Sequence, residues 1–376
     1  MDEGPNSSLE EFNDHVKKWV EDTREFVISN AMLNTIMIGL SVILNGIIAI
    51  AGVLSNSVNV LVFIRLGLKD SMSVGLWALS FTDLVVSVLH LCRCTSYLFA
   101  IMYPFSQVDY WIIGRFYFGW ARYVCYFISC WITTLIALER CYCVVSPFKV
   151  KQVFTKTKCV AFILVMCAIH IAMLIQIYVY PFFQWGRYST DQKDTNGSDI
   201  YFMQMKLQMT VETAQAQFNM NIVVGVVLSV TSQVLIILCT VWMIYSLKSS
   251  SRIRKSAISR HRERADNLSP REKRLVKIVI MLAIIQTVGS IPRFFVTIVV
   301  HHVLRGVQLG TYNNLGILMW EVANLFGTVY DTSKPVSSIT RQALSWNTQG
   351  KMKRDRPQMA WRFAMEDDTK KNGYNW

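Results

Sequence analysis

The stretch IMIGLSVILNGIIAIAGVLSNSVNVLVFIRL, residues 36–66, contains one charged side chain, Arg65. A helix of about 20 apolar residues crosses the hydrocarbon core of a bilayer, so this stretch is long enough for a complete span. Six more apolar blocks lie near 72–98, 111–144, 157–182, 219–247, 274–303 and 309–332. Because the blocks are continuous rather than alternating in polarity, we predict an all-α membrane protein, a seven-transmembrane helix bundle.

The composition of the whole chain agrees with this prediction. Hydrophobic residues make up 52% of the 376 residues and charged residues 17%, which is less charge than a soluble domain usually carries. The formal net charge is +13, and the Lys and Arg residues gather in the loops after the first, third and fifth blocks. This distribution is typical of membrane topology, so no nucleic-acid partner is expected.

The basic loops also set the orientation of the chain, because an excess of Lys and Arg marks the cytoplasmic side. The acidic segment 1–35 is then extracellular. The seven-span domain covers 36–332, and the polar segment 333–376 is a cytoplasmic tail. A mixed loop near 183–218 falls on the outer side.

Three N-glycosylation sequons test this orientation. Asn6-Ser-Ser and Asn196-Gly-Ser fall on the outer side, and Asn267-Leu-Ser falls on the inner side. Glycosylation takes place on the outer side, so we predict a glycoprotein modified at Asn6 and Asn196 and unmodified at Asn267.

The nine cysteines all lie inside the apolar blocks or at their edges. None is paired with histidines at a zinc-binding spacing, so we expect small, buried, reduced thiols. Cys92 and Cys94 lie near the outer end of the second span. The sequence leaves open whether either of them forms a disulfide.

Several ionisable side chains lie inside the predicted spans, where a buried charge is costly and is a functional candidate by default. They are Asp83, Arg93, Arg115, Arg122, Arg140, Arg293 and Glu321. On the third span, helical periodicity places Arg115, Arg122 and Arg140 on one stripe with Tyr126 and Ser129. Lipid would not accept this stripe, so we predict that the third span is the central helix of the bundle.

Pro292 lies within the sixth span. Proline removes a backbone hydrogen bond and bends a helix, so a kink is expected there. The kink is either a moving part or a static bend that improves packing, and the sequence does not decide between them.

An ordered set of short motifs runs through the spans. It consists of Asn56 in Ser-Asn-Ser-Val, Leu79-Ser-Phe-Thr-Asp83, Glu139-Arg140-Cys141, Pro147-Phe148, Glu272 and Pro292. In order, spacing and placement over roughly 36–332, this set resembles that of rhodopsin-like (class A) G-protein-coupled receptors. At finer detail the chain resembles invertebrate, molluscan-type peptide or chemosensory receptors.

The resemblance implies a plasma-membrane receptor that binds an extracellular ligand and activates a heterotrimeric G protein. Glu139, Arg140 and Glu272 would form the activation switch with Pro292, opening the inner ends of spans 3 and 6. Pro147 and Phe148 would contact the G protein.

The resemblance also implies a mid-membrane polar cluster of Asp83, Asn56 and Ser129 that binds sodium in many such receptors. A hard cation takes oxygen ligands, and Asp83 would supply the negative charge. The alternative is a buried aspartate that hydrogen-bonds to its neighbours without an ion. No other cofactor is expected.

Several features of the family are missing. The third span begins without the family's cysteine, and the loop near 183–218 has none, so the usual outer disulfide cannot form. Gly289-Ser290-Ile291-Pro292 stands in place of Cys-Trp-x-Pro. The Asn-Pro-x-x-Tyr motif is absent. The most similar stretch runs from Asn324 to Tyr330 and has a different spacing and no proline.

The charged residues in the outer halves of the spans indicate the charge of the ligand. Arg122 occupies the position where amine receptors carry an aspartate, and there is no span-7 lysine for retinal. An excess of guanidinium groups favours an anionic ligand, so we expect a peptide or a small acidic cue. The predicted ligand-binding residues are Arg93, Arg115, Arg122, Tyr126 and Glu321. The alternative is an internal Arg122–Glu321 ion pair that serves the structure.

Two other functions stay open. Buried charges and a proline kink also fit a channel or transporter. The missing motifs also fit a receptor-like protein that has lost signalling. An enzyme is not expected, because no histidine cluster and no Ser-His-Asp set is present.

Overall fold

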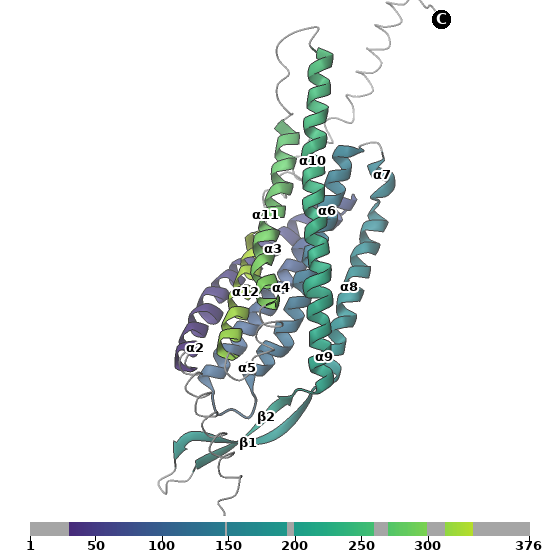
Figure 1. The fold of residues 1–376 in the computed structure, drawn as a ribbon. Helices are drawn as coiled ribbons and strands as arrows, with labels where there is room; N and C mark the ends of the chain where they lie inside the picture. Colours follow the sequence, from purple (N-terminus) through teal and green to yellow (C-terminus); the bar gives the residue numbers. More distant parts are fainter. Residues whose placement is uncertain (1–29, 147–148, 194–198, 259–269, 299–312, 334–376) are drawn as a thin grey trace, which may run out of the picture.

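The computed structural model describes residues 30–146, 149–193, 199–258, 270–298 and 313–333. In these ranges the chain is almost entirely helical, and the helices lie roughly side by side as one elongated bundle (Figure 1). Within the described residues these helices form seven spans, which cover 30–66, 71–102, 110–145, 156–179, 211–258, 270–298 and 313–333. The predicted residues Asn6, Asn196, Pro147 and Phe148 lie outside the described residues.

Spans 1 to 4 follow one another along the first half of the chain. Span 1 comprises α2 (Asn30–Met37), the π-helical segment η1 (Ile38–Leu44) and α3 (Asn45–Leu66), and span 2 is α4 (Ser71–Met102). Span 3 comprises α5 (Tyr110–Ile113), η2 (Gly114–Phe118) and α6 (Gly119–Val145). A short helix, α7 (Val150–Val153), precedes α8 (Lys156–Val179), which is span 4.

Spans 5 to 7 complete the bundle. Span 5 comprises α9 (Val211–Met220), η3 (Asn221–Leu228) and α10 (Ser229–Ile258), so it begins and ends outside the predicted limits. Helix α10 runs past the neighbouring helices at its carboxyl end (Figure 1). Span 6 is α11 (Pro270–Ile298), with Pro292 inside it, and span 7 is α12 (Asn313–Ser333).

Hydropathy distinguishes the first five spans from the last two. Within the described residues, five helices are apolar and long enough to cross a membrane, and they are those of spans 1 to 5. Helix α11 contributes a shorter apolar stretch, Ala283–Val296. It begins with the polar sequence Pro-Arg-Glu-Lys-Arg, which lowers its mean hydropathy.

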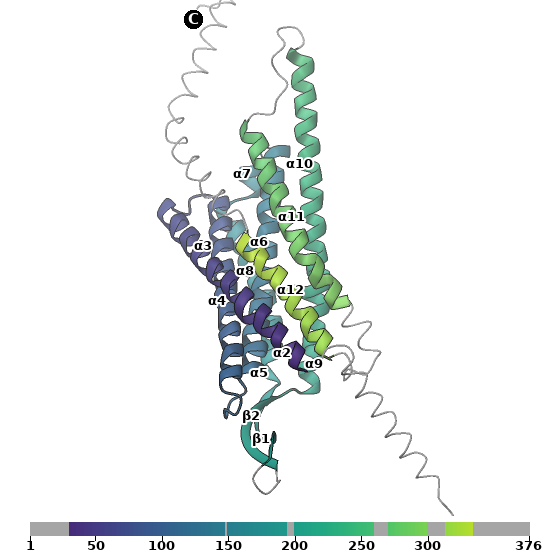
Figure 2. The same ribbon diagram turned by 90° about the vertical axis from the view of Figure 1, so that its left-hand side faces the viewer.

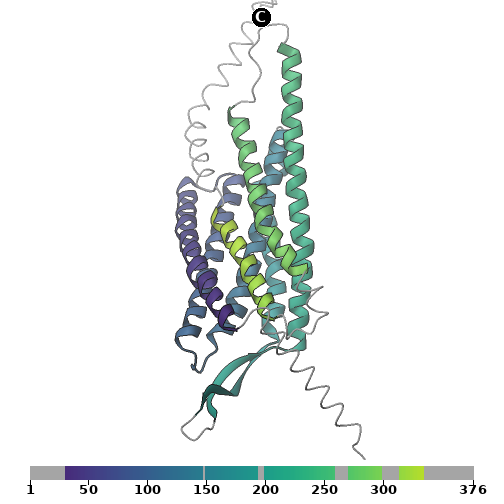
Figure 3. The same ribbon diagram turned by 60° about the vertical axis from the view of Figure 1, so that its left-hand side comes forward.

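Helix α6 lies at the centre of the bundle, as its polar stripe predicts. In its most apolar window 83% of the residues are buried, against 17% in α8 and 33–44% in the other three candidate spans. The views in Figures 2 and 3 show α12 beside α2 and α3, on the side of the bundle away from α8. The prediction that span 3 is central is therefore confirmed.

The outer loop between spans 4 and 5 folds into a hairpin, which the sequence did not predict. Strands β1 (Phe182–Lys193) and β2 (Asp199–Gln208) pair antiparallel, with Phe182 opposite Gln208. The amide of Met205 donates to the carbonyl of Gln107 at 2.8 Å, and the side chain of Gln204 donates to the carbonyl of Ser106 at 3.3 Å. These bonds tie the hairpin to the start of span 3, where the family uses a disulfide. All nine cysteines lie in described segments and are free thiols.

Gly52 sets the distance between three helices. A Cβ atom built on Gly52 of α3 would lie 2.5 Å from Ser87 Oγ of α4 and 3.0 Å from Thr332 Oγ1 of α12. Gly46, also on α3, has nothing within 4 Å of the same point. Small residues allow membrane helices to approach closely, so Gly52 is where α3, α4 and α12 meet.

We expect Gly52→Ala to lower the unfolding temperature of the purified protein, because the new methyl group forces α4 and α12 away from α3. The matched substitution Gly46→Ala should leave it unchanged or raise it, since alanine favours a helix by about 1 kcal/mol over glycine. Thermal unfolding in detergent measures both. Equal effects of the two substitutions would contradict the assigned packing.

Candidate functional site

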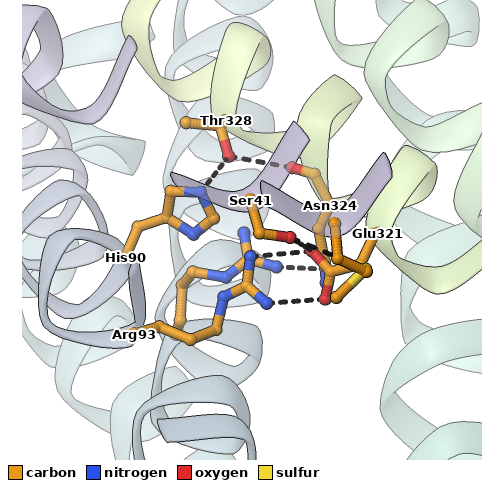
Figure 4. A network of polar contacts seen from close by, with 8 residues as sticks. Ser41, His90, Arg93, Glu321, Asn324 and Thr328 are labelled. Atoms are coloured by element: carbon orange, nitrogen blue, oxygen red, sulfur yellow. Dashed lines mark hydrogen bonds and ion pairs between the residues drawn. The ribbon is translucent and has the colours of Figure 1, made fainter. Parts of the chain in front are cut away.

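A buried ion pair joins span 2 to span 7 near the outer end of the bundle. Arg93 of α4 donates from Nη1 to Glu321 Oε1 at 2.6 Å and from Nη2 to Oε2 at 2.9 Å (Figure 4). Ser41 of η1 donates to Glu321 Oε2 at 3.0 Å. A bidentate pair with a further donor satisfies both charges without water. The pair that the sequence left open, Arg122 with Glu321, does not form, because Arg93 takes the carboxylate.

A small cavity of about 20 Å³ lies beside this ion pair. It is lined by Met37, Ser41, Arg93, Tyr97, Trp111, Arg115, Ile317 and Glu321. A cavity of this size holds about one water molecule. The exposed Arg115 lies against its aromatic wall, with the guanidinium 5.1 Å from the centre of the Trp111 ring. Two of the predicted ligand-binding arginines, Arg93 and Arg115, therefore share one cavity.

Arg122 lies deeper and belongs to a different group of side chains. It donates a hydrogen bond from Nη2 to the side-chain oxygen of Asn324 on α12. One turn further along α12, Thr328 contacts His90 Nε2 at 3.2 Å and donates to the carbonyl of Asn324 at 2.8 Å (Figure 4). The predicted residue Tyr126 lies next to this group and contacts Ser290 of α11 at 3.3 Å. Arg122 and Tyr126 thus line the centre of the bundle rather than its mouth.

A chain of polar side chains continues from Tyr126 toward the inner side. Gln233 of α10 donates to Ser290 Oγ at 2.9 Å, and Gln286 of α11 donates to Ser232 Oγ at 2.9 Å. Ser232 in turn contacts Thr134 of α6 at 2.7 Å. We call Ser232, Gln233, Gln286 and Ser290 the glutamine ladder; it links spans 3, 5 and 6.

Tyr330 joins span 7 to the same level of the bundle. Its hydroxyl donates to Gln286 Oε1 at 3.4 Å and contacts Thr133 Oγ1 of α6 at 3.3 Å. Its ring packs on Tyr126 with centroids 5.4 Å apart. Thus α6, α11 and α12 meet around one buried tyrosine.

The predicted mid-membrane cluster is partly assembled. Ser129 donates to Asp83 Oδ1 at 2.6 Å, and both side chains are fully buried. Asn56 is also buried, at 3% exposure. No group of three or more His, Cys, Asp or Glu side chains that could hold a metal occurs among the described residues.

At the inner end of span 3, Glu139 is held by span 2. Ser71 of α4 donates to Glu139 Oε1 at 2.7 Å, and the described residues include no ion pair between Glu139 and Arg140. Pro292 lies inside α11, and the side chain of Glu272 is outside the described residues. The structure therefore gives Glu139 a partner that the sequence did not suggest.

Sequence reasoning missed Ser41, Ser71 and the glutamine ladder. Gln233 and Gln286 could have been identified from the sequence, because a glutamine in an apolar span usually hydrogen-bonds to another helix. The serines carry no such signal, since a single hydroxyl can bond to its own helix.

One comparison identifies relatives of the chain. A family model described as "7 transmembrane receptor (rhodopsin family)" matches residues 56–330. That range runs from Asn56, in the second half of span 1, to Tyr330, near the end of span 7. No curated protein matches the sequence.

We expect Arg93→Gln to reduce surface expression and unfolding temperature strongly, because it leaves Glu321 buried without its cation. Breaking a buried pair by removing one partner typically costs about 3–5 kcal/mol. The double variant Arg93→Gln with Glu321→Gln should recover most of the loss, since no charge is then stranded. A double variant no better than the single one would show that the two residues do not act as a pair.

Proposed function

Because the chain belongs to the rhodopsin family of seven-transmembrane receptors, we propose that it binds an extracellular ligand with a negatively charged group and activates a heterotrimeric G protein. The family is one of receptors and not of enzymes, and its members are multi-pass membrane proteins. The plasma membrane is the location at which such a ligand would be met.

The observation that carries the ligand class is the charge balance of the outer half. Arg93 is neutralised by Glu321, but Arg115 and Arg122 have no hydrogen bond to a carboxylate among the described residues. Arg115 is exposed and would meet an approaching ligand first. Guanidinium groups bind carboxylates through two parallel hydrogen bonds, which favours a small acid or an acidic peptide over an amine.

The small size of the outer cavity indicates how binding would be coupled to a change of shape. A space for one water molecule does not admit a ligand, so the outer ends of α2, α4 and α12 have to separate when one binds. A ligand shifts such an equilibrium only through its different affinity for the two states. Contacts of the ligand with the side chains that line the widened cavity form only in the open state and supply that difference.

The path from the outer half to the inner side would run through α11. Its Pro292 lies between Arg293 and the glutamine ladder, so a bend at this proline moves one of them relative to the other. Outward movement of the inner part of α11 would separate it from α6 and uncover Arg140. The G protein would then contact this surface together with Pro147 and Phe148.

The cluster of Asp83 and Ser129 supports a sodium site in this proposal. Their oxygen atoms are the donors that a hard cation takes, and Asp83 supplies a negative charge at the middle of the membrane. Asn56 would complete the ligand set. A buried aspartate that only hydrogen-bonds to Ser129 is the alternative.

A G-protein activation assay in transfected cells, with libraries of carboxylate metabolites and peptides, tests the proposed function. For an acidic agonist, Arg115→Gln should weaken potency about tenfold or more, because a hydrogen bond to a charged group contributes about 1.5–3 kcal/mol. Arg65→Gln, an exposed arginine at the inner end of α3, is the matched control and should leave potency unchanged.

Three outcomes of this assay would contradict the proposal. Activation by cationic ligands alone would exclude the ligand class. Ion flux without G-protein activation would favour a channel or transporter. A chain that reaches the surface but activates no G protein with any ligand would be a receptor that has lost signalling.

We expect Glu272→Ala to raise ligand-independent signalling, because it removes the proposed partner of Arg140 across the inner ends of spans 3 and 6. The comparison is made at equal surface expression. Glu272→Asp keeps the charge and should stay close to the wild-type level. If the two variants signal equally, the inner ion pair does not hold the resting state.

A further inference from the structure

Two buried arginines in the middle of the bundle lack acceptors for most of their hydrogen bonds. Arg122 of α6 and Arg293 of α11 are each 2% exposed. Within the described part of the chain, Nε and Nη1 of Arg122 and all three nitrogens of Arg293 have no hydrogen-bond partner. Buried guanidinium groups are normally paired, so this site lacks an acceptor.

Both guanidinium groups approach the same point on span 7. A Cβ atom built on Gly327 of α12 would lie 3.0 Å from Arg293 Nη2 and 3.8 Å from Arg122 Nη1. Glycine is the residue that permits this, because any side chain would occupy the space between the two cations. Two positive groups from different helices therefore converge where span 7 has no side chain.

Aromatic contacts account for only part of the environment of Arg293. Its guanidinium lies 4.3 Å from the ring centre of Tyr126, 5.2 Å from that of Tyr123 and 5.8 Å from that of Phe127. These contacts stabilise the positive charge through the faces of the aromatic rings. They leave its in-plane N–H donors available for an acceptor.

The contrast with Arg93 shows which component is missing. The carboxylate of Glu321 compensates the buried charge of Arg93 within the protein. The hydroxyl of Ser41 donates a further hydrogen bond to the same carboxylate. The hydrogen-bond partner of Arg122 is the neutral side chain of Asn324, and among the described residues Arg293 contacts aromatic rings. The carboxylates of Asp331 and Glu321 also act on Arg122, but each acts less strongly than the positive charge of Arg293. Two like charges in a low-dielectric interior repel each other strongly, and a negative charge between them removes both the repulsion and the unmet hydrogen bonds.

We propose that a compact monovalent anion binds between Arg122 and Arg293, against Gly327. A chloride ion and the carboxylate of a bound ligand have the same chemistry toward these donors. The site itself does not depend on the proposed function; only a ligand carboxylate as its occupant does. An anion here would hold α6, α11 and α12 together at the level of Tyr126, next to Pro292.

The test is the unfolding temperature of the full-length receptor purified in detergent. Sodium gluconate, whose anion is too large for the site, is replaced by sodium chloride or sodium acetate at a constant ionic strength of about 0.15 M. We expect a rise of about 4 °C with chloride or with acetate for a site that is mostly occupied. A rise with chloride identifies an inorganic ion as occupant, and a rise with acetate alone identifies a carboxylate group.

Two variants assign the effect to this site. Arg293→Gln removes one cation, and Gly327→Ala keeps both cations but places a methyl group against Arg293 Nη2; both should abolish the rise. Arg65→Gln removes an exposed arginine at the inner end of α3 and should preserve it. Gly327→Ala keeps the test decisive if Arg293→Gln does not fold.

Either of two results would overturn the proposal. One is a wild-type protein with the same unfolding temperature in all three salts. The other is a rise that persists in full in both Arg293→Gln and Gly327→Ala, which would place the anion elsewhere. Neither result depends on whether the receptor activates a G protein, so the two proposals fail separately.

Discussion

The arrangement of the bundle depends on how α6 buries its polar stripe. Lipid cannot accept Arg122, Ser129 or Thr133, so α6 has to be surrounded by helices that offer acceptors, donors or aromatic faces. The stripe meets α12 at Asn324 and Tyr330 and α4 at Asp83, and the neighbouring Thr134 meets α10 at Ser232. Each contact fixes the rotation of a neighbouring helix about its own axis. The central position of α6 is thus a consequence of its polar residues and not of its hydrophobicity.

Small residues allow the helices to approach closely, and this close packing also fixes the position of the outer loops. Gly52 brings α3 against α4 and α12, and at Gly114 a Cβ would meet the Cβ of Ser96 at 2.6 Å, which draws η2 against α4. With the start of span 3 held in this way, the backbone hydrogen bond from Met205 to Gln107 and the side-chain hydrogen bond from Gln204 to Ser106 place the outer loop. The absence of the family's disulfide is therefore compatible with an ordered outer surface.

The sequence predicts the architecture well because burial of apolar length is a local property of the chain. The seven blocks, the central span 3 and the proline within span 6 follow from composition and periodicity alone. The pairing of buried polar residues on different spans is not a local property of the chain. The sequence suggests Arg122 as the partner of Glu321, whereas in the structure the carboxylate pairs with Arg93 and also accepts a hydrogen bond from Ser41 of η1. The hairpin was not predicted, because its two strands have a mixed composition without a regular alternation of apolar and polar residues.

The glutamine ladder and the region around Arg293 differ in how many of their polar groups form hydrogen bonds. This difference indicates where the bundle can change shape. Gln233 of α10 hydrogen-bonds to α11, and Gln286 of α11 has partners on both α10 and α12, so the glutamine ladder resists separation of α10 from α11. Directly beyond Ser290, Arg293 has aromatic contacts but no hydrogen bonds. Pro292 lies at this boundary, where the α-helical hydrogen-bond series is already interrupted. An anion bound at Arg293 would therefore act on the part of α11 that is least restrained by hydrogen bonds.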